Sequence, residues 1–276
     1  MIKWICLLLG VALSLNGTEF ISKPSSYSES DIRIVPVTPT PEPNHVALRV
    51  IFPRPYENKR KNPVNIQLRL QSFPLGMMTE NERAKEIYND PEGQTLHVIV
   101  DNALYFTWNQ TMESSSEEDL DFYDKLVSFY LPNSLRSGRH ILRCFPVRSY
   151  GESLKGKGCF MSQVFYFQDR KKSSTSNIDL EQPYLTYNEP QGRYPFHKSN
   201  PILLDFYLSN CELSAEGYKV RVSIDGKVLR LLTNWSPYYL YGLQKGKHKI
   251  QLELLDANHS LVSGDFNVTE REIEID

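Results

Sequence analysis

Two stretches of this chain share one pattern: Leu135–Val147 reads LRSGRHILRCFPV, and Leu243–Asp256 reads LQKGKHKIQLELLD. Each has leucine, glycine, a basic residue and histidine at identical spacing, and each continues into an alternating apolar run. Alternation with a period of two is typical of a half-buried strand, because successive side chains point to opposite faces. The pattern therefore predicts one structural unit, a turn followed by a strand, that occurs twice.

Further blocks repeat in the same order. The segment NPVNIQLRL (62–70) aligns with NPILLDFYL (200–208), and HVIVDN (97–102) aligns with RVSIDG (221–226). A third block has five identities at one constant offset: Ser128, Tyr130, Leu135, Gly138 and His140 align with Ser236, Tyr238, Leu243, Gly246 and His248. The sequence is therefore interpreted as a tandem duplication.

Each copy contains about seven short strands with turn signals every eight to twelve residues, which is typical of a two-sheet antiparallel sandwich. Asp225 and Gly226 form the dipeptide of a tight hairpin, and Asn102 can adopt the same left-handed conformation in the first copy. The predicted fold class is all-β, with two tandem antiparallel Ig-like sandwiches.

At the level of architecture, the chain resembles the immunoglobulin-like or fibronectin-type domains of exported bacterial proteins. The resemblance rests on the strand count, the Asp225–Gly226 turn and the GKHKIQLELLD strand. It implies adhesion, spacing or partner binding and no active site. The cysteine pair and buried tryptophan of antibody domains are absent from the pattern.

Composition shifts divide the chain into five parts. We expect a signal peptide (1–17), a proline-rich linker (18–43), a first sandwich with two insertions (44–168), a polar linker (169–180) and a second sandwich (181–276). The insertions are Met78–Asp90, where Thr79 could cap a short helix, and Glu113–Lys125.

The N-terminus begins with Lys3 and an apolar run from Trp4 to about Leu15, followed by small residues. This is the pattern of a secretory signal peptide and predicts an exported protein, whether periplasmic, cell-surface or secreted. A membrane anchor left uncut is the alternative, so contact with a membrane is expected only through an uncleaved signal. Bacterial and eukaryotic secretion both remain open, as does glycosylation at the four sequons of Asn109, Asn234, Asn258 and Asn267.

The formal net charge of −2 gives no electrostatic reason to expect a nucleic acid partner. No nucleophile elbow or phosphate-binding glycine loop occurs, so neither an enzyme nor a cofactor is expected. The repeated histidines, His140 and His248, lack ligand partners at zinc spacing and are interpreted as caps of a sandwich end, bonded to a loop carbonyl. The acidic insertion reads either as a solvated loop or as a calcium site without EF-hand spacing.

Aromatic residues gather in NWSPYYLYGL, where Trp235, Tyr238 and Tyr239 are the candidate ligand-binding residues. Rings stack on sugars and anchor protein interfaces, so these three would suit a carbohydrate-binding or docking face. The alternative is that they alternate between the core and the strand edge.

Three cysteines remain once Cys6 is removed with the signal. Cys144 and Cys159 flank a predicted hairpin and could form a cross-strand disulfide, with Cys211 free. In the competing interpretation Cys144 is a small core residue, because Leu252 occupies its position in the second copy.

The sequence therefore predicts an exported, non-catalytic protein whose paired sandwiches bind or space a macromolecular partner. The alternative is a carbohydrate-recognition or enzyme-accessory module. A protein and a glycan both remain candidate partners.

Overall fold

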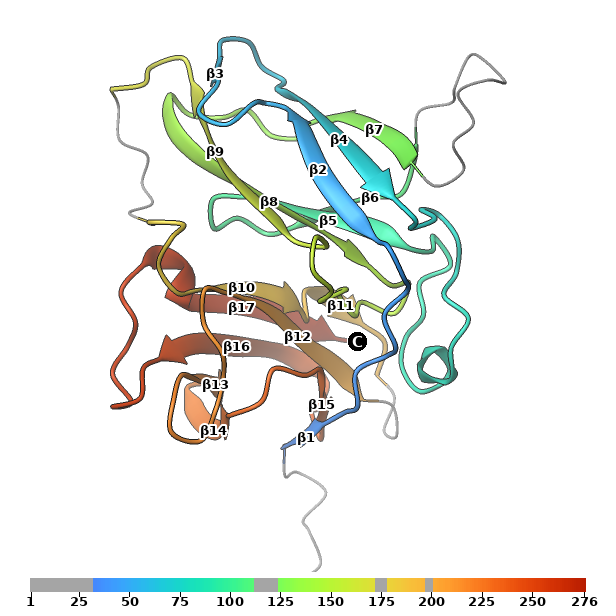
Figure 1. Ribbon diagram of the computed structural model, residues 1–276. Helices are drawn as coiled ribbons and strands as arrows, with labels where there is room; N and C mark the ends of the chain where they lie inside the picture. The colour runs from blue at the N-terminus through green and yellow to red at the C-terminus, as the bar shows by residue number, and fades with distance from the viewer. Residues whose placement is uncertain (1–31, 112–123, 172–177, 197–200) are drawn as a thin grey trace, which may run out of the picture.

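The predicted all-β fold is confirmed, and each half of the chain contributes two facing sheets (Figure 1). The computed structural model describes residues 32–111, 124–171, 178–196 and 201–276. The expected signal peptide (1–17) lies outside these ranges, and so does most of the acidic insertion, Glu113–Lys125.

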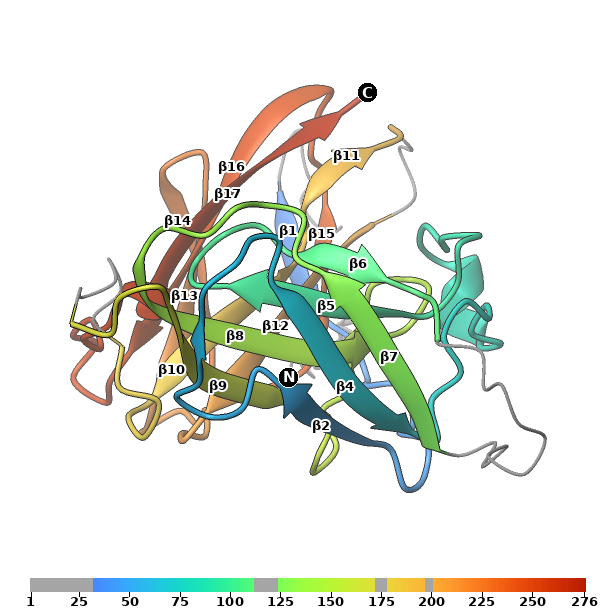
Figure 2. The same cartoon turned by 90° about the horizontal axis from the view of Figure 1, so that it is seen from above.

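The first sandwich pairs a three-stranded sheet with a five-stranded sheet. The smaller sheet has the order β2 (Ala47–Phe52), β4 (Asn65–Gln71), β7 (Asp124–Tyr130). The larger has the order β3 (Asn58–Lys59), β9 (Met161–Phe167), β8 (Gly138–Val147), β5 (Thr95–Val100), β6 (Phe106–Trp108). Figure 2 shows the strands of the smaller sheet side by side in front of β8 and β5. All pairs are antiparallel except β3 with β9.

The second sandwich repeats this topology. One sheet has the order β10 (Tyr184–Glu189), β12 (Ile202–Ser209), β15 (Tyr238–Tyr241), with β1 (Arg33–Pro36) added beyond β15. The other has the order β11 (Gly192–Tyr194), β17 (Val268–Ile275), β16 (Gly246–Leu255), β13 (Lys219–Ile224), β14 (Lys227–Leu232). The short strand β11 runs parallel to β17, as β3 does to β9. The shared strand order supports the predicted duplication.

Alternating apolar residues give each sandwich its own core. In the first, Ile66, Leu68 and Leu70 of β4 pack against the inner face of the larger sheet. In the second, Leu204, Phe206 and Leu208 of β12 do the same. Burial of an aliphatic or aromatic side chain contributes about 1.5–3 kcal/mol, so these rows are the main source of fold stability.

The segment 18–43 is not only a linker, and this expectation is wrong for its second half. Residues Arg33–Pro36 form β1 and pair antiparallel with β15 of the second sandwich, although they precede the first sandwich in the chain. Ile34 is buried in the second core. Thr40 is also buried, and its backbone N–H and hydroxyl donate to Glu152. The segment therefore connects the second sandwich to the first.

The two sandwiches pack directly on each other. The outer face of the first sandwich's larger sheet presents Ile99, Phe145 and Val147, which contact Tyr207 on the outer face of β12. Alternation predicted that β12 is buried on one face, but Leu203, Asp205 and Tyr207 are buried as well. The second face of this strand is covered by the other sandwich, a contact that a pattern within one strand does not reveal.

The first insertion, Met78–Asp90, reaches the second sandwich. It contains a 3-10 helix, η1 (Glu82–Lys85), which Asn81 caps in place of the expected Thr79. Arg83 is buried, with its Nε 3.0 Å from the Glu152 carboxylate and a guanidinium N–H donating to the Tyr239 hydroxyl. The insertion therefore strengthens the contact between the sandwiches. A second 3-10 helix, η3 (Asp265–Asn267), precedes β17.

Part of the predicted second linker, 169–180, also packs. Ile178 is buried beside Ile141 of β8 and Phe266 of η3. Residues 172–177 lie outside the described ranges. Within those ranges, none of the helices combines the length and the apolar character that a membrane crossing requires.

Candidate functional site

The repeated histidines have the same surroundings in both copies. His140 Nδ1 lies 2.8 Å from the Asp101 carboxylate and Nε2 lies 2.7 Å from the Arg136 carbonyl oxygen. His248 lies 2.7 Å from Asp225 and 2.8 Å from the carbonyl of Gln244. In both copies the aspartate also accepts the backbone N–H of the residue after the histidine. The interpretation as a structural cap bonded to a loop carbonyl is confirmed.

The aspartate of the turn is left-handed in both copies, with φ 56° at Asp101 and φ 51° at Asp225. Gly226 is left-handed as well (φ 76°), but Asn102, its counterpart in the first copy, is not, so the expectation for Asn102 is wrong. Burial lowers the pKa of His140, but the hydrogen bonds to Asp101 and Arg136 outweigh it and the net shift is upward. Both ring nitrogens are engaged, so His140 is not free to act as a general base. Within the described ranges no group of three or more His, Cys, Asp or Glu residues is placed to hold a metal ion.

The three candidate aromatic residues do not form an exposed face. Tyr238 is buried in the second core, whereas Tyr239 is buried on the opposite face of β15 against Ile87 and Leu203. Trp235 is half-buried, and its indole N–H donates to the Phe206 carbonyl over 2.9 Å. The placement matches the alternation between core and strand edge, and Tyr238 and Tyr239 have no exposed ring face to offer a ligand.

The possible disulfide between Cys144 and Cys159 is not formed. All three described cysteines are free, and the ladder pairs Cys144 with Met161 instead. Cys144 is fully buried in the first core, where Leu252 stands in the second, so the small-core-residue interpretation holds. The Cys159 thiol points at the Val46 carbonyl, 3.8 Å away.

A buried carboxylate lies at the junction of the sandwiches. Glu189, at the end of β10, accepts hydrogen bonds from the hydroxyls of Tyr105 (2.6 Å) and Tyr194 (2.7 Å). The backbone N–H of Gln191 donates to it as well, over 3.1 Å. Burial raises the pKa of Glu189 to about 7, against the opposite effect of these donors. Tyr105 belongs to the first sandwich, so this network joins the two.

A second polar group lies beside it. Asp205 of β12 is fully buried and accepts from the Ser153 hydroxyl (2.6 Å) and from Lys155 (2.5 Å). Asn188 donates to Asp205 over 2.7 Å and contacts His97 Nδ1, also over 2.7 Å. Burial lowers the pKa of His97 to about 4, so this imidazole is neutral at neutral pH. Because the donors and acceptors are paired, these groups fix the junction rather than await a ligand.

One feature of the sequence could have indicated this junction. Asp205 interrupts the apolar run NPILLDFYL, and a lone carboxylate in such a run is expected to be buried with a partner. Tyr105 and Glu189 carry no comparable signal, because each lies next to a turn where polar residues are ordinary.

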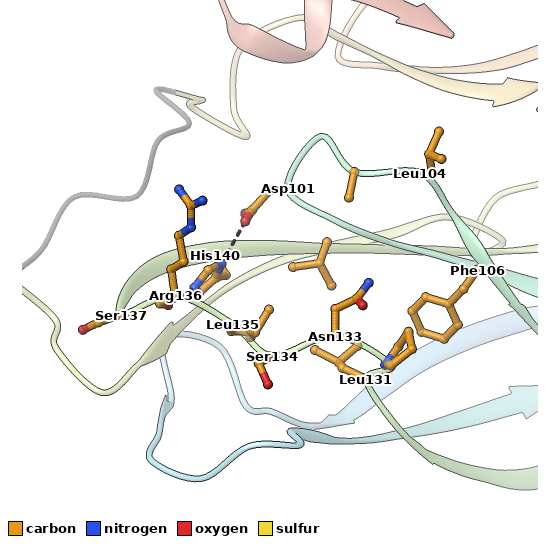
Figure 3. Close-up of a pocket in the computed structure, with 13 residues that line it drawn as sticks. Asp101, Leu104, Phe106, Leu131, Asn133, Ser134, Leu135, Arg136, Ser137 and His140 are labelled. Atoms are coloured by element: carbon orange, nitrogen blue, oxygen red, sulfur yellow. Dashed lines mark hydrogen bonds and ion pairs between the residues drawn. The ribbon is translucent and has the colours of Figure 1, made fainter. Parts of the chain in front are cut away.

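Among the described residues, two hollows are large enough to be considered as ligand sites. A cleft of about 400 Å³ lies between the sandwiches, lined by Tyr88, His97, Tyr105, Glu189 and Tyr194. The larger hollow, which we call the end pocket, has about 690 Å³ and lies at one end of the first sandwich (Figure 3). The titratable groups of both hollows have partners within the protein, so the end pocket differs from the cleft in its larger volume and its apolar walls.

The end pocket is mainly apolar. Ala103, Leu104 and Phe106 line one wall, and residues 131–137 of the β7–β8 connection line the other. In Figure 3 the labelled Leu104 lies across the pocket from Leu131 and Leu135. Leu104 is 57% exposed at the rim, while Leu131 is 3% exposed at the base. The pocket therefore offers apolar surface to a partner.

The end pocket is open because residues 101–106, which form one of its walls, are bonded to the second sandwich. In the second copy β13 and β14 pair up to Ile224 and Lys227, next to a two-residue turn. In the first copy the pairing of β5 with β6 stops at Val98 and Phe106. The residues between Val98 and Phe106 bond to the second sandwich instead. Arg271 donates to the carbonyls of Asn102 and Ala103, and the Tyr105 hydroxyl donates to the Glu189 carboxylate.

Comparisons with known proteins identify no family for this chain. No protein-family model matches the sequence, and no curated protein matches it. The solved structures that are similar to this chain include fibronectin-type domains, at low TM-scores.

Three of these structures illustrate the range. Fibronectin(III)-like modules of Clostridium thermocellum CbhA have 11% identity and a TM-score of 0.27, with 83% of this chain and 93% of that chain covered. The Bacteroides ovatus glucan-utilization protein SGBP-B, in complex with a mixed-linkage heptasaccharide, has 14% identity, a TM-score of 0.18 and coverage of 89% and 47%. Domains FN1–FN3 of chicken CNTN1 have 12% identity, a TM-score of 0.22 and coverage of 80% and 67%. At these scores the likeness carries no argument about a ligand.

Proposed function

We propose that this chain is an exported, non-catalytic binding protein, and that its partner is a protein whose apolar side chains enter the end pocket. The observation that carries the proposal is the pocket itself, an apolar hollow of about 690 Å³ with an exposed leucine at its rim. Apolar pockets of this size are the usual sites at which a partner buries an anchoring side chain.

The surroundings support binding rather than catalysis. His140 is the only histidine that lines the pocket, and both of its ring nitrogens are bonded to the protein. Of the other polar lining residues, Asp101 accepts from His140 and from the Ile141 N–H, and Asn133, Ser134, Arg136 and Ser137 supply amide, hydroxyl and guanidinium groups. Residues 101–106 are hydrogen-bonded to the second sandwich, so this wall of the pocket is already ordered before a partner binds. Binding therefore costs less conformational entropy. Export rests on the pattern of residues 1–17.

A peptide-display experiment tests the proposal. Random peptides selected on the intact protein would be titrated against wild type and against Leu104→Asp, which places a carboxylate at the pocket rim. Leu261→Asp is the matched control, because Leu261 is 50% exposed and lies outside the pocket, in the second sandwich.

We expect Leu104→Asp to weaken binding by about tenfold or more, because a desolvated carboxylate opposes the apolar contact. Binding to Leu261→Asp should match wild type. Peptides that bind both variants equally would contradict a site at the end pocket. A glycan array distinguishes the carbohydrate alternative, which saturable glycan binding would favour.

A further inference from the structure

The second sandwich shows what fills the place that corresponds to the end pocket. There, β1 lies antiparallel along β15, with Ile34 opposite Leu240 and Val35 opposite Tyr239. The Ile34 side chain is buried in the core, and the Arg230 guanidinium of β14 donates to the Ile34 carbonyl. An extended segment from elsewhere in the chain thus closes the side of the sandwich between β15 and β14.

The ladders identify the corresponding residues of the first sandwich. Ile66 pairs with Phe129 as Leu204 pairs with Tyr238, so residues 129–131 correspond to residues 238–240. Val98 pairs with Phe106 as Val222 pairs with Arg230. In the second copy Ile34 lies between Leu240 and Arg230. The corresponding residues of the first copy are Leu131 and Phe106, so the space between these two matches the position of Ile34. Both residues line the end pocket.

The backbone at this place is also comparable. The Leu131 N–H donates to the Val64 carbonyl of the neighbouring strand over 2.9 Å. Because backbone groups of successive residues in a strand point to opposite sides, the N–H and carbonyl of Tyr130 face the edge of β7 on which no described strand lies. Tyr239 occupies the matching position in β15, and next to it Val37 donates to the Pro237 carbonyl over 2.9 Å. The edge of β7 is thus oriented to accept a strand.

We infer that the end pocket receives an extended segment of a protein partner, laid antiparallel along 129–131 as β1 lies along β15. Its anchor is an aliphatic, β-branched side chain that enters between Leu131 and Phe106, as Ile34 enters beside Leu240. The backbone of the segment exchanges hydrogen bonds with Tyr130. This inference rests on the proposed function and adds the conformation and the anchor residue of the partner.

The chain itself supplies the probe, a synthetic peptide of Ile32–Thr38. It would be titrated against the intact protein by calorimetry, together with two N-methylated versions. Methylation at Val35 removes the N–H that faces the receiving strand, whereas methylation at Ile34 removes one that faces away. The two versions carry the same added methyl group and differ only in which side of the strand is blocked.

We expect weak saturable binding of the unmodified peptide at concentrations up to about 1 mM. Methylation at Val35 should reduce affinity about tenfold, because a hydrogen bond is lost and a methyl group meets the strand edge, while methylation at Ile34 changes it less than about threefold. A peptide with Ile34→Asp should not bind. Leu104→Asp in the protein should abolish binding, which excludes exchange of the peptide into the slot of β1.

Equal affinity of the two methylated peptides would overturn strand addition, and so would failure of the unmodified peptide to bind. Either result leaves the proposed function to be judged separately, by whether displayed peptides depend on Leu104. Loss of that dependence would overturn the proposed function itself.

Discussion

Ile34 lies directly opposite Leu240 in the sheet of the second sandwich, although residues 44–168 of the first sandwich separate the two along the chain. Its side chain is 6% exposed in the second core. From β1 in the second sandwich, the chain therefore passes the junction at Thr40 and enters the first sandwich at β2. This crossing makes the second sandwich depend on residues outside 181–276.

The first prediction tests that dependence. Ile34→Ala should lower the free energy of unfolding by about 2 kcal/mol, because it leaves a cavity in a core that is otherwise closed. Val35→Ala, on the exposed side of the same strand, should change it by less than about 0.5 kcal/mol. Denaturant unfolding of the full chain measures both. Equal, small effects would mean that the segment is only a linker.

The second prediction concerns the fragment 181–276. This fragment lacks β1, and its β10–β12–β15 sheet loses the cover of the first sandwich. We therefore expect a broad thermal transition at lower temperature than that of the full chain. A sharp transition at the temperature of the full chain would show that neither β1 nor the junction contributes to stability.

The third prediction is a pH dependence that originates at Glu189. Its pKa is about 7 in the folded protein and 4.5 in the unfolded reference, so the folded state binds the proton more tightly. The corresponding stability is complete below about pH 4.5 and is lost as the pH rises through 7, a change of about 3 kcal/mol at most.

Glu189→Gln keeps the shape of the side chain and removes the titration. The variant should match wild type near pH 5 and be the more stable of the two near pH 8. Glu270→Gln, on the exposed face of β17, is the control and should follow the wild-type profile. If the Glu189→Gln profile also follows that of wild type, the buried carboxylate does not titrate in this range.

The fourth prediction concerns the thiols. Burial raises the pKa of the Cys144 thiol strongly and that of Cys159 to about 11, so neither is a reactive thiolate at neutral pH. Alkylation of the native protein should therefore leave Cys144 unmodified. Alkylation after unfolding without reductant should modify Cys144, Cys159 and Cys211. A cross-linked Cys144–Cys159 peptide in the mass spectrum would contradict the structure.

Local alternation predicted the strands well because each strand buries one face within its own sandwich. Ile66, Leu68 and Leu70 and their counterparts Leu204, Phe206 and Leu208 lie where the pattern places them. The repeated histidine was also predictable, because it follows a turn glycine at the start of a core-facing row. These features depend on neighbours that are close in sequence or in one ladder.

The junction could not be predicted in the same way. The outward residues of β12 look like ordinary strand residues, and rings of the first sandwich, Phe145 and Phe160 among them, pack on Tyr207. One identity in the alignment was also misleading. Tyr130 is 63% exposed while Tyr238 is 2% exposed, and the ladders match Tyr238 with Phe129 instead. The sequence alignment is therefore shifted by one residue from the structural correspondence, and such a shift exchanges the buried and exposed faces of a strand. For this reason the end pocket could not be predicted from the sequence.

Methyl NMR of the intact protein with a display-selected peptide tests the central claim, a binding site at the end pocket, most directly. We predict that the methyl signals of Leu104, Leu131 and Leu135, which line the pocket, shift on titration. The signal of Leu261 should stay in place. Shifts confined to the cleft beside Leu203, or spread evenly over both sandwiches, would contradict the account.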